Sequence, residues 1–318
     1  MPALGGRKSG ARGRSARSTT ITPSATREVQ GIREAAATIT RCARKERATH
    51  AARIRLFGIT QYYNSRSPLS NSRRRLYHEK TTFLAKERFP IIPIRDTIPS
   101  SRTPIVNYAL ILLNSAVFLY QFTLGDAASD FAYAYGVIPY RFLHLFTSHP
   151  MELLTPLFAM FLHGGWLHVI GNMLFLYIFG DNVEDILGHG RYLIFYFLCG
   201  VASFLVQILF QSNSMVPNVG ASGAIAGVLG AYLLLFPRAR IVTLLPIFIF
   251  FTVVEIPAFI FIGIWFLIQF ASGALTLGRT EALSGGVAWW AHVGGFLVGM
   301  LLIKLMAPRG PARRPVVV

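Results

Sequence analysis

The sequence predicts an all-α membrane protein with six membrane-spanning helices, preceded by a basic and mostly disordered N-terminal tail. Long apolar runs follow one another from residue 105 onward, and a span needs about twenty such residues. Charge is unevenly divided, because residues 1–104 hold 22 of the 31 lysines and arginines but only 6 of the 14 acids. We therefore expect a basic region at 1–91, a membrane domain at 92–308 and a short C-terminal tail at 309–318.

The basic region has no sustained hydrophobic period and is too rich in glycine, serine and charge to bury a core. It is expected to be mostly disordered and cytosolic. Its arginine- and serine-rich, acid-poor start also fits an organellar transit peptide, and an upstream extension of the reading frame stays open. No nucleic-acid partner is expected, because neither aromatic residues nor a helical face organise the charges.

The first two apolar runs differ in length. Residues 106–124 supply one span, whereas residues 153–180 are too long for one upright helix. The middle of the second run is interrupted by His163, two glycines and His168. Irregular backbone at membrane depth survives only against protein or water, so we expect an interfacial or re-entrant segment and then a helix that starts near Trp166.

The second half of the domain supplies the remaining spans. Residues 192–210 and 219–236 each match one crossing. Residues 241–270 again exceed one crossing, and their two prolines and one glutamate predict an interfacial stretch before the fifth span. Residues 288–306 form the sixth span, so both termini are expected on the same side.

Basic residues indicate which side that is. They flank the first span at its N-terminal end and follow the fourth and sixth spans, so these ends are expected to be cytosolic. An acidic loop at 181–191 falls on the same side, but acids count little in this rule. We expect an integral multi-pass protein of a bacterial inner (plasma) membrane with cytoplasmic termini, and an organellar inner membrane is the alternative.

Four polar side chains are expected at one depth, just inside the outer face. They are Ser222 on the fourth span, His292 on the sixth, and His168 with Asn172 on the second. Polar groups at that depth are costly unless they pair or line a wet cavity, so their convergence predicts a functional site. A serine in an apolar helix can also simply bond its own backbone, which is the alternative interpretation.

Small residues make contact between the fourth and sixth spans plausible. They recur three or four positions apart, which lets two helix backbones approach closely. On the fourth span they are Gly223, Gly227 and Gly230, and on the sixth they are Ala291, Gly295 and Gly299. His292 shares the face of Gly295 and Gly299, so a close crossing would bring it to Ser222.

This pair of residues has a chemical use. A serine hydroxyl attacks well only when a base removes its proton, and imidazole does so at little cost near neutral pH. No buried carboxylate stands out as an orienting third member, so a dyad is expected. His168 and Asn172, four apart on one helical face, and the Ser222 backbone N–H could all point at a developing oxyanion. Interhelical hydrogen bonding alone is the other role open to His168 and Asn172.

Three ordered segments resemble the signature motifs of rhomboid intramembrane serine proteases. They are HGGWLHVIGN at 163–172, GASGAIAG at 220–227 and AHVGGFLVG at 291–299, within a resemblance that covers about residues 95–306. The resemblance implies a rhomboid-like bundle of six transmembrane helices. Two departures stand out: Ala226 replaces a tyrosine that packs on the catalytic imidazole in some members, and Arg141 lacks the tryptophan that accompanies an arginine in the family's first outer loop.

The resemblance also implies a role for each matching residue. Ser222 is expected to be the nucleophile and His292 the general base. The oxyanion would be bound with help from His168 and Asn172. Supporting roles fall to Gly220 and Gly223, the glycines of the nucleophile motif, and to His163 as a structural or water-holding residue. Gly227, Gly295 and Gly299 are expected to pack the helices, as their spacing indicates.

Other protease chemistries lack their residues in the membrane domain. The only His-Glu pair, His78-Glu79, lies in the basic tail and lacks the second histidine of a zinc protease. The sole lysine of the domain, Lys304, is at the cytosolic end of the sixth span, and the predicted spans contain no aspartate. No metal or other cofactor is expected.

The expected function is therefore intramembrane serine endopeptidase activity near the outer membrane face. The expected partners are single-span transmembrane substrates and membrane lipid, and the sequence does not indicate an oligomeric state. The alternative is a catalytically inactive protein of this fold that binds transmembrane helices.

Overall fold

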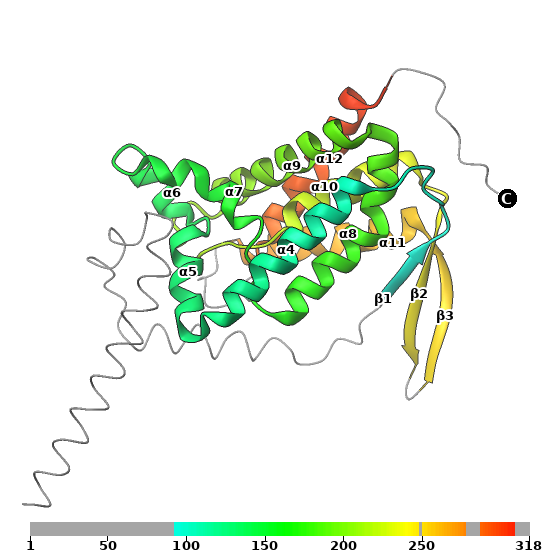
Figure 1. Ribbon diagram of the computed structural model, residues 1–318, viewed down its shortest axis with the longest axis horizontal. Coiled ribbons are helices and arrows are strands. Elements are labelled where there is room, and N and C mark those ends of the chain that lie inside the picture. The colour runs from blue at the N-terminus through cyan, green and yellow to red at the C-terminus, as the bar shows by residue number, and fades with distance from the viewer. Residues whose placement is uncertain (1–91, 248–249, 278–286, 309–318) are drawn as a thin grey trace, which may run out of the picture. The chain divides into compact units, whose positions relative to one another are not determined.

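A computed structural model describes residues 92–247, 250–277 and 287–308. The predictions for the basic tail at 1–91 and the C-terminal tail at 309–318 lie outside these residues. Within the described part, helices dominate and one small sheet lies at an end of the helical bundle (Figure 1).

The chain enters through strand β1 (Ile92–Asp96) and then crosses the bundle in helix α4 (Ile105–Thr123). Short elements follow at the far end of α4 and were not predicted individually. They are η1 (Gly125–Ala127), α5 (Ala128–Tyr135), α6 (Pro139–Leu145), η2 (Pro150–Leu154) and α7 (Thr155–Ala159). The expected helix from near Trp166 is confirmed, because α8 (Trp166–Leu187) begins at that residue, while the interfacial or re-entrant placement of the segment before it stays a prediction.

Four more helices complete the bundle: α9 (His189–Phe210), α10 (Ser222–Leu235), α11 (Ala258–Thr276) and α12 (Trp289–Met306). Helix α10 is the central one. Every residue from Gly223 to Tyr232 is buried, and the helix packs against α8, α9 and α12. Its alanines and glycines allow this, because small side chains let several helices approach one axis.

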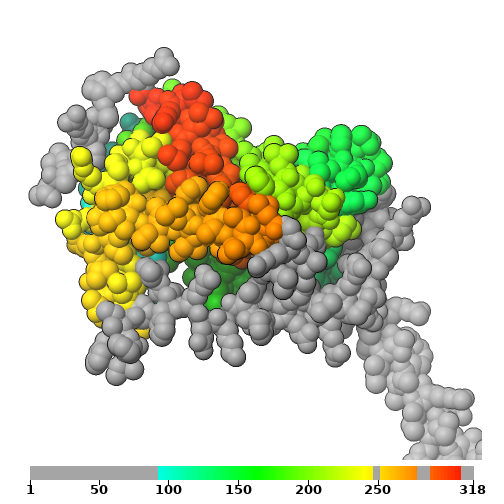
Figure 2. Space-filling model, turned by 180° about the vertical axis from the view of Figure 1, so that it is seen from behind, coloured from blue at the N-terminus to red at the C-terminus, as the bar shows by residue number. Residues whose placement is uncertain are grey.

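Helix α11 is peripheral by comparison. Figure 2 shows α11 in orange against α12 in red, on one face of the molecule. Its outward side chains, such as Phe259, Ile264 and Leu267, are apolar and exposed. Such a surface suits lipid rather than water.

The described residues contain four helices that are long and apolar enough to cross a membrane, namely α4, α9, α11 and α12. The protein is thus an integral multi-pass membrane protein, while the count of six spans stays a prediction. Helix α10 has only 14 residues, or about 21 Å at 1.5 Å per residue, against a hydrocarbon core of about 30 Å. It begins at Ser222, three residues later than the predicted fourth span.

The expectation of an all-α fold is wrong in one respect. The stretch expected to be interfacial forms a hairpin of β2 (Arg240–Ile247) and β3 (Phe250–Pro257), and β1 adds antiparallel to β2 in the order β1-β2-β3. Pro246 is compatible with strand structure because it pairs only with β3, beyond the last β1 partner at Leu244. A short apolar run does not distinguish a strand from a buried helix, which explains the error.

The predicted acidic loop at 181–191 is also wrong in form, because α8 continues as a helix to Leu187 and α9 starts at His189. The Glu184 carboxylate accepts hydrogen bonds from the backbone N–H groups of Val106 (3.0 Å) and Asn107 (2.7 Å), at the start of α4. A carboxylate is favourable at a helix N-terminus, so Glu184 holds the end of α8 against the start of α4.

Candidate active site

Ser222 is the first residue of helix α10, and this position determines its surroundings. The preceding residue, Ala221, has no side chain that could cap the helix. The first backbone N–H groups of a helix lack intrahelical acceptors, and they carry the positive end of the helix dipole. The Ser222 hydroxyl therefore lies beside unpaired N–H groups that favour negative charge.

His292 reaches this hydroxyl from the first turn of α12. Its Nε2 lies 2.8 Å from the Ser222 Oγ, a hydrogen-bond distance between residues 70 positions apart. The turn that carries His292 is held by α9, since the backbone N–H of Ala291 donates to Gln207 Oε1 at 3.1 Å. The nucleophile motif and the base motif thus meet as one hydrogen-bonded pair.

The other ring nitrogen of His292 contacts a residue that the sequence reasoning missed. Gln269 Oε1, on α11, lies 2.8 Å from His292 Nδ1. The Trp265 ring, one turn earlier on the same helix, lies 6.0 Å from the imidazole between centroids, at an interplanar angle of 37°. A lone glutamine inside an apolar span was the available signal, and α11 supplies both a polar and an aromatic neighbour of the imidazole.

His168 and Asn172 approach the nucleophile motif from α8. The Gly164 backbone N–H donates to His168 Nδ1 at 3.2 Å, which leaves Nε2 as the protonated nitrogen. That nitrogen faces Gly220, where φ is +129° and an added Cβ would lie 2.8 Å from it. Only glycine suits both the backbone angle and the space at this position.

Asn172 brings an unused donor to the same place. Its side-chain nitrogen is buried and has no hydrogen-bond partner in the described part of the chain, and it lies 3.7 Å from the point that an added Cβ would occupy at Gly220. A buried amide without a partner is costly, so the site maintains an open hydrogen-bonding position. Donors at that position suit an oxygen that becomes negative.

His163 packs against His168. The side chain is buried, and neither ring nitrogen has a partner among the described residues. Its ring packs edge-on against His168, with centroids 5.2 Å apart. The Gln121 side chain holds its backbone, since the His163 N–H donates to Gln121 Oε1 at 2.9 Å.

The glycines predicted to pack α10 against α12 lie at that crossing. An added Cβ at Gly295 would meet the carbonyl oxygen of Gly223, and one at Gly299 would meet that of Gly227. On the opposite side, Gly227 faces the buried Cys199 of α9. Since backbone atoms cannot rotate away as a side chain can, these contacts fix the spacing of the helices that carry Ser222 and His292.

Arg141 takes part in contacts among the short elements between α4 and α8. On α6, it forms a salt bridge with the buried Glu152 of η2 at 2.7 Å, and it donates to the Tyr133 carbonyl of α5 at 2.6 Å. These bonds join three short elements outside the long helices, without the tryptophan of the family pattern.

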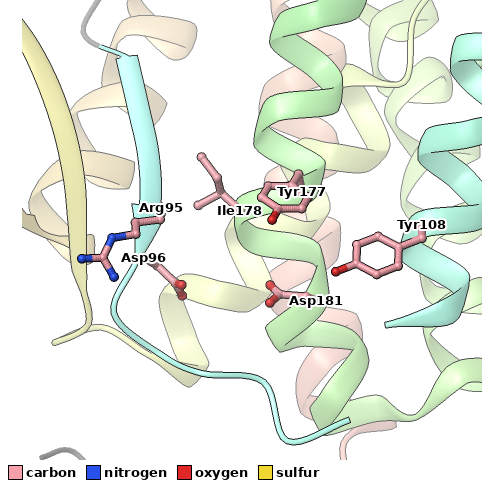
Figure 3. A pocket seen from close by; sticks show the side chains of 6 residues that line it. All are labelled: Arg95, Asp96, Tyr108, Tyr177, Ile178 and Asp181. Carbon is pink, nitrogen blue, oxygen red and sulfur yellow. The ribbon is translucent and has the colours of Figure 1, made fainter. Parts of the chain in front are cut away.

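A second polar group lies at the sheet end of the bundle. Asp96 of β1 accepts hydrogen bonds from the Tyr232 hydroxyl (2.5 Å) and the Asn182 amide (2.9 Å). It borders a pocket of about 140 Å³ that Asp181 and two tyrosines also line (Figure 3). Burial raises the pKa of Asp96 to about 7. Tyr232 is ten residues beyond Ser222 on α10, or about 15 Å, so this group is remote from the serine.

The fold and the site define a helical multi-pass membrane protein with a serine and a histidine paired inside its bundle. Residues 150–309, half of the chain, match the family model described as the Rhomboid domain. The chain belongs to the rhomboid family.

Three relatives illustrate the range of the match. The chain is 30% identical to zebrafish (Danio rerio) presenilin-associated rhomboid-like protein A, mitochondrial, over 51% of this chain and 41% of that protein. It is 30% identical to rhomboid protein 1, mitochondrial, of Saccharomyces cerevisiae, over 45% and 39% respectively. It is 42% identical to the rhomboid protease GluP of Bacillus subtilis, over 26% and 15%. The matched segment thus spans less than half of each relative.

Proposed function

We propose that this protein is an intramembrane serine endopeptidase that cleaves transmembrane proteins near the outer membrane face. The 2.8 Å contact between His292 Nε2 and Ser222 Oγ carries the proposal. A base within hydrogen-bond distance of a hydroxyl is the arrangement that nucleophilic catalysis requires. The name of the bacterial relative, rhomboid protease GluP, supports the same activity.

The reaction follows from the geometry. As Ser222 Oγ attacks the substrate carbonyl carbon, its proton passes to His292 Nε2 and the carbonyl oxygen becomes an oxyanion. The Ser222 backbone N–H, His168 Nε2–H and Asn172 Nδ2–H are the donors for that oxyanion. His292 then protonates the leaving amine as the peptide C–N bond breaks. A water molecule, deprotonated by His292, hydrolyses the acyl ester and restores the Ser222 hydroxyl.

The substrates are proposed to be single-span membrane proteins that reach the site within the bilayer, with lipid as the other partner. Two of the relatives carry "mitochondrial" in their names, which favours the organellar inner membrane over the bacterial inner membrane expected first. A catalytically inactive protein that binds transmembrane helices is the second candidate, and the unpartnered Asn172 amide favours the protease over it.

Fluorophosphonate labelling tests the proposal directly. An activated serine reacts with the probe, whereas an ordinary hydroxyl does not. The full chain should be labelled, and Ser222→Ala or His292→Ala should each abolish both labelling and cleavage of a model transmembrane substrate. Ser203→Ala is the matched control, because among the described residues the buried Ser203 hydroxyl donates only to the Gly200 carbonyl, at 2.7 Å. Substantial turnover by either dyad variant would contradict the assignment.

A further inference from the structure

Gln269 is an unusual residue for its position. Helix α11 is apolar along most of its length, yet it places an amide with 7% exposure at His292. Burying an amide in a membrane helix is costly unless it is hydrogen-bonded, and here the partner is the imidazole Nδ1 at 2.8 Å. The glutamine is thus satisfied by the same residue that contacts the serine.

The contact has a consequence for the protonation of the ring. The neutral imidazole has one N–H, and it can accept the Ser222 proton at Nε2 only when that N–H is at Nδ1. The Gln269 Oε1 is an acceptor, so it favours the tautomer with the proton at Nδ1. The same bond limits rotation of the ring about its axis.

On these grounds we propose that Gln269 is a positioning residue that turns the Ser222–His292 pair into a Ser–His–Gln arrangement. The inference rests on the proposed protease function and deepens it. Gln269 acts through His292, as the orienting third group of other nucleophilic triads acts through their histidine. When His292 holds the serine proton, the amide oxygen continues to accept its Nδ1–H.

A carboxylate would also accept the Nδ1–H of His292, but a neutral amide does so at a lower cost in stability. An isolated charge within the membrane carries a large desolvation cost, whereas an amide oxygen provides the acceptor without one. The imidazole also lies 6.0 Å, between ring centroids, from Trp265, which is four residues before Gln269 and therefore on the same face of α11. Gln269 and Trp265 thus approach the imidazole from one helix, α11, which lies against α12 (Figure 2).

The test compares three variants of the full chain with the unchanged protein in detergent. Gln269→Met keeps the length of the side chain but removes the acceptor, and Gln269→Glu restores an acceptor oxygen. Thr276→Val is the control, because in the described part of the chain the Thr276 hydroxyl donates only to the Gly273 carbonyl of its own helix, at 2.6 Å. The readouts are kcat and KM for a model transmembrane substrate, the rate of fluorophosphonate labelling, and the temperature of unfolding.

We expect Gln269→Met to lower kcat and the labelling rate about 100-fold, the cost of a misplaced reacting group, with KM within about twofold. Gln269→Glu should regain most of that loss, and Thr276→Val should match the unchanged protein. A folded Gln269→Met variant with unchanged kcat would overturn the inference. If that variant unfolds, a folded but inactive Gln269→Glu overturns it and an active one supports it. Absence of labelling in the unchanged protein would instead overturn the proposed function, and this inference with it.

Discussion

Gly220→Ala is expected to damage the site without touching a reacting group. The added Cβ would lie 2.8 Å from His168 Nε2 and 2.9 Å from Cε1, whereas ordinary contact begins at 3.4 Å. The imidazole or the loop must therefore move by about 0.6 Å. In addition, a φ of +129° is one that side chains rarely adopt, and holding it costs about 1–3 kcal/mol.

The displacement of His168 should lower kcat more than it lowers the unfolding temperature. A displaced His168 no longer aims its N–H at the oxyanion, and losing one such donor costs on the order of 100- to 1000-fold in kcat. Since the displacement is partial, we expect a decrease of about 100-fold. The assay is cleavage of a model transmembrane substrate in detergent, with the unfolding temperature measured in parallel.

Gly164→Ala is the matched control, because its added methyl group would lie near the other ring nitrogen of the same His168 imidazole. Its Cβ would lie 3.7 Å from His168 Nδ1, an ordinary contact, and the Gly164 N–H that donates to this nitrogen is kept. We expect nearly unchanged kcat. Equal activity in the two variants would refute the argument that the space at Gly220 holds His168 in place.

Three further predictions concern the oxyanion donors, the sheet end and the basic tail. Asn172→Ala should lower kcat on the order of 100- to 1000-fold without abolishing cleavage, because other donors remain, and unchanged kinetics would leave only a packing role for the amide. Burial raises the pKa of Asp96 to about 7 in the folded protein. The Asp96 carboxyl therefore contributes stability that is fully present below its ordinary pKa of 3.8 and is lost as the pH rises through about 7. Asp96→Asn should therefore raise the unfolding temperature more at about pH 8 than at about pH 5, and an equal change at both would contradict this. Removing residues 1–91 should leave cleavage in detergent close to the full rate, since none of the assigned groups lies there. Removing 1–97 also deletes β1 and the Asp96 acceptor, so it should destabilise the protein by at least about 1–3 kcal/mol, and equal unfolding temperatures for the two truncations would argue against the role of β1.

The helices and their order could be predicted because they depend on local properties of the chain. Apolar runs of membrane length fixed most helix positions within a few residues, as for α4 and α12. The start of α8 near Trp166 followed from the polar interruption before it. The approach of Ser222 to His292 followed from matched depth and glycine spacing, which are also sequence properties, and in the structure His292 Nε2 lies 2.8 Å from Ser222 Oγ.

The three-stranded sheet could not be predicted in this way. Strand β1 pairs with β2 across more than 140 positions, and nothing local in either segment specifies the other as its partner. A short apolar run next to a membrane span is compatible with a strand, a buried helix or an interfacial segment. Residues 240–257 form strands because they pair with each other and with β1.

The surroundings of the imidazole were likewise decided by tertiary structure. The sequence alone determined a membrane bundle, the serine and histidine motifs, and the absence of a nearby aromatic residue at Ala226. That Gln269 meets His292 depends on how α11 is rotated and placed against α12, because the face that a nearly uniform apolar helix turns inward is not encoded by its hydrophobic period. Only packing between the two helices selects the face that carries the glutamine, and with it the acceptor at Nδ1.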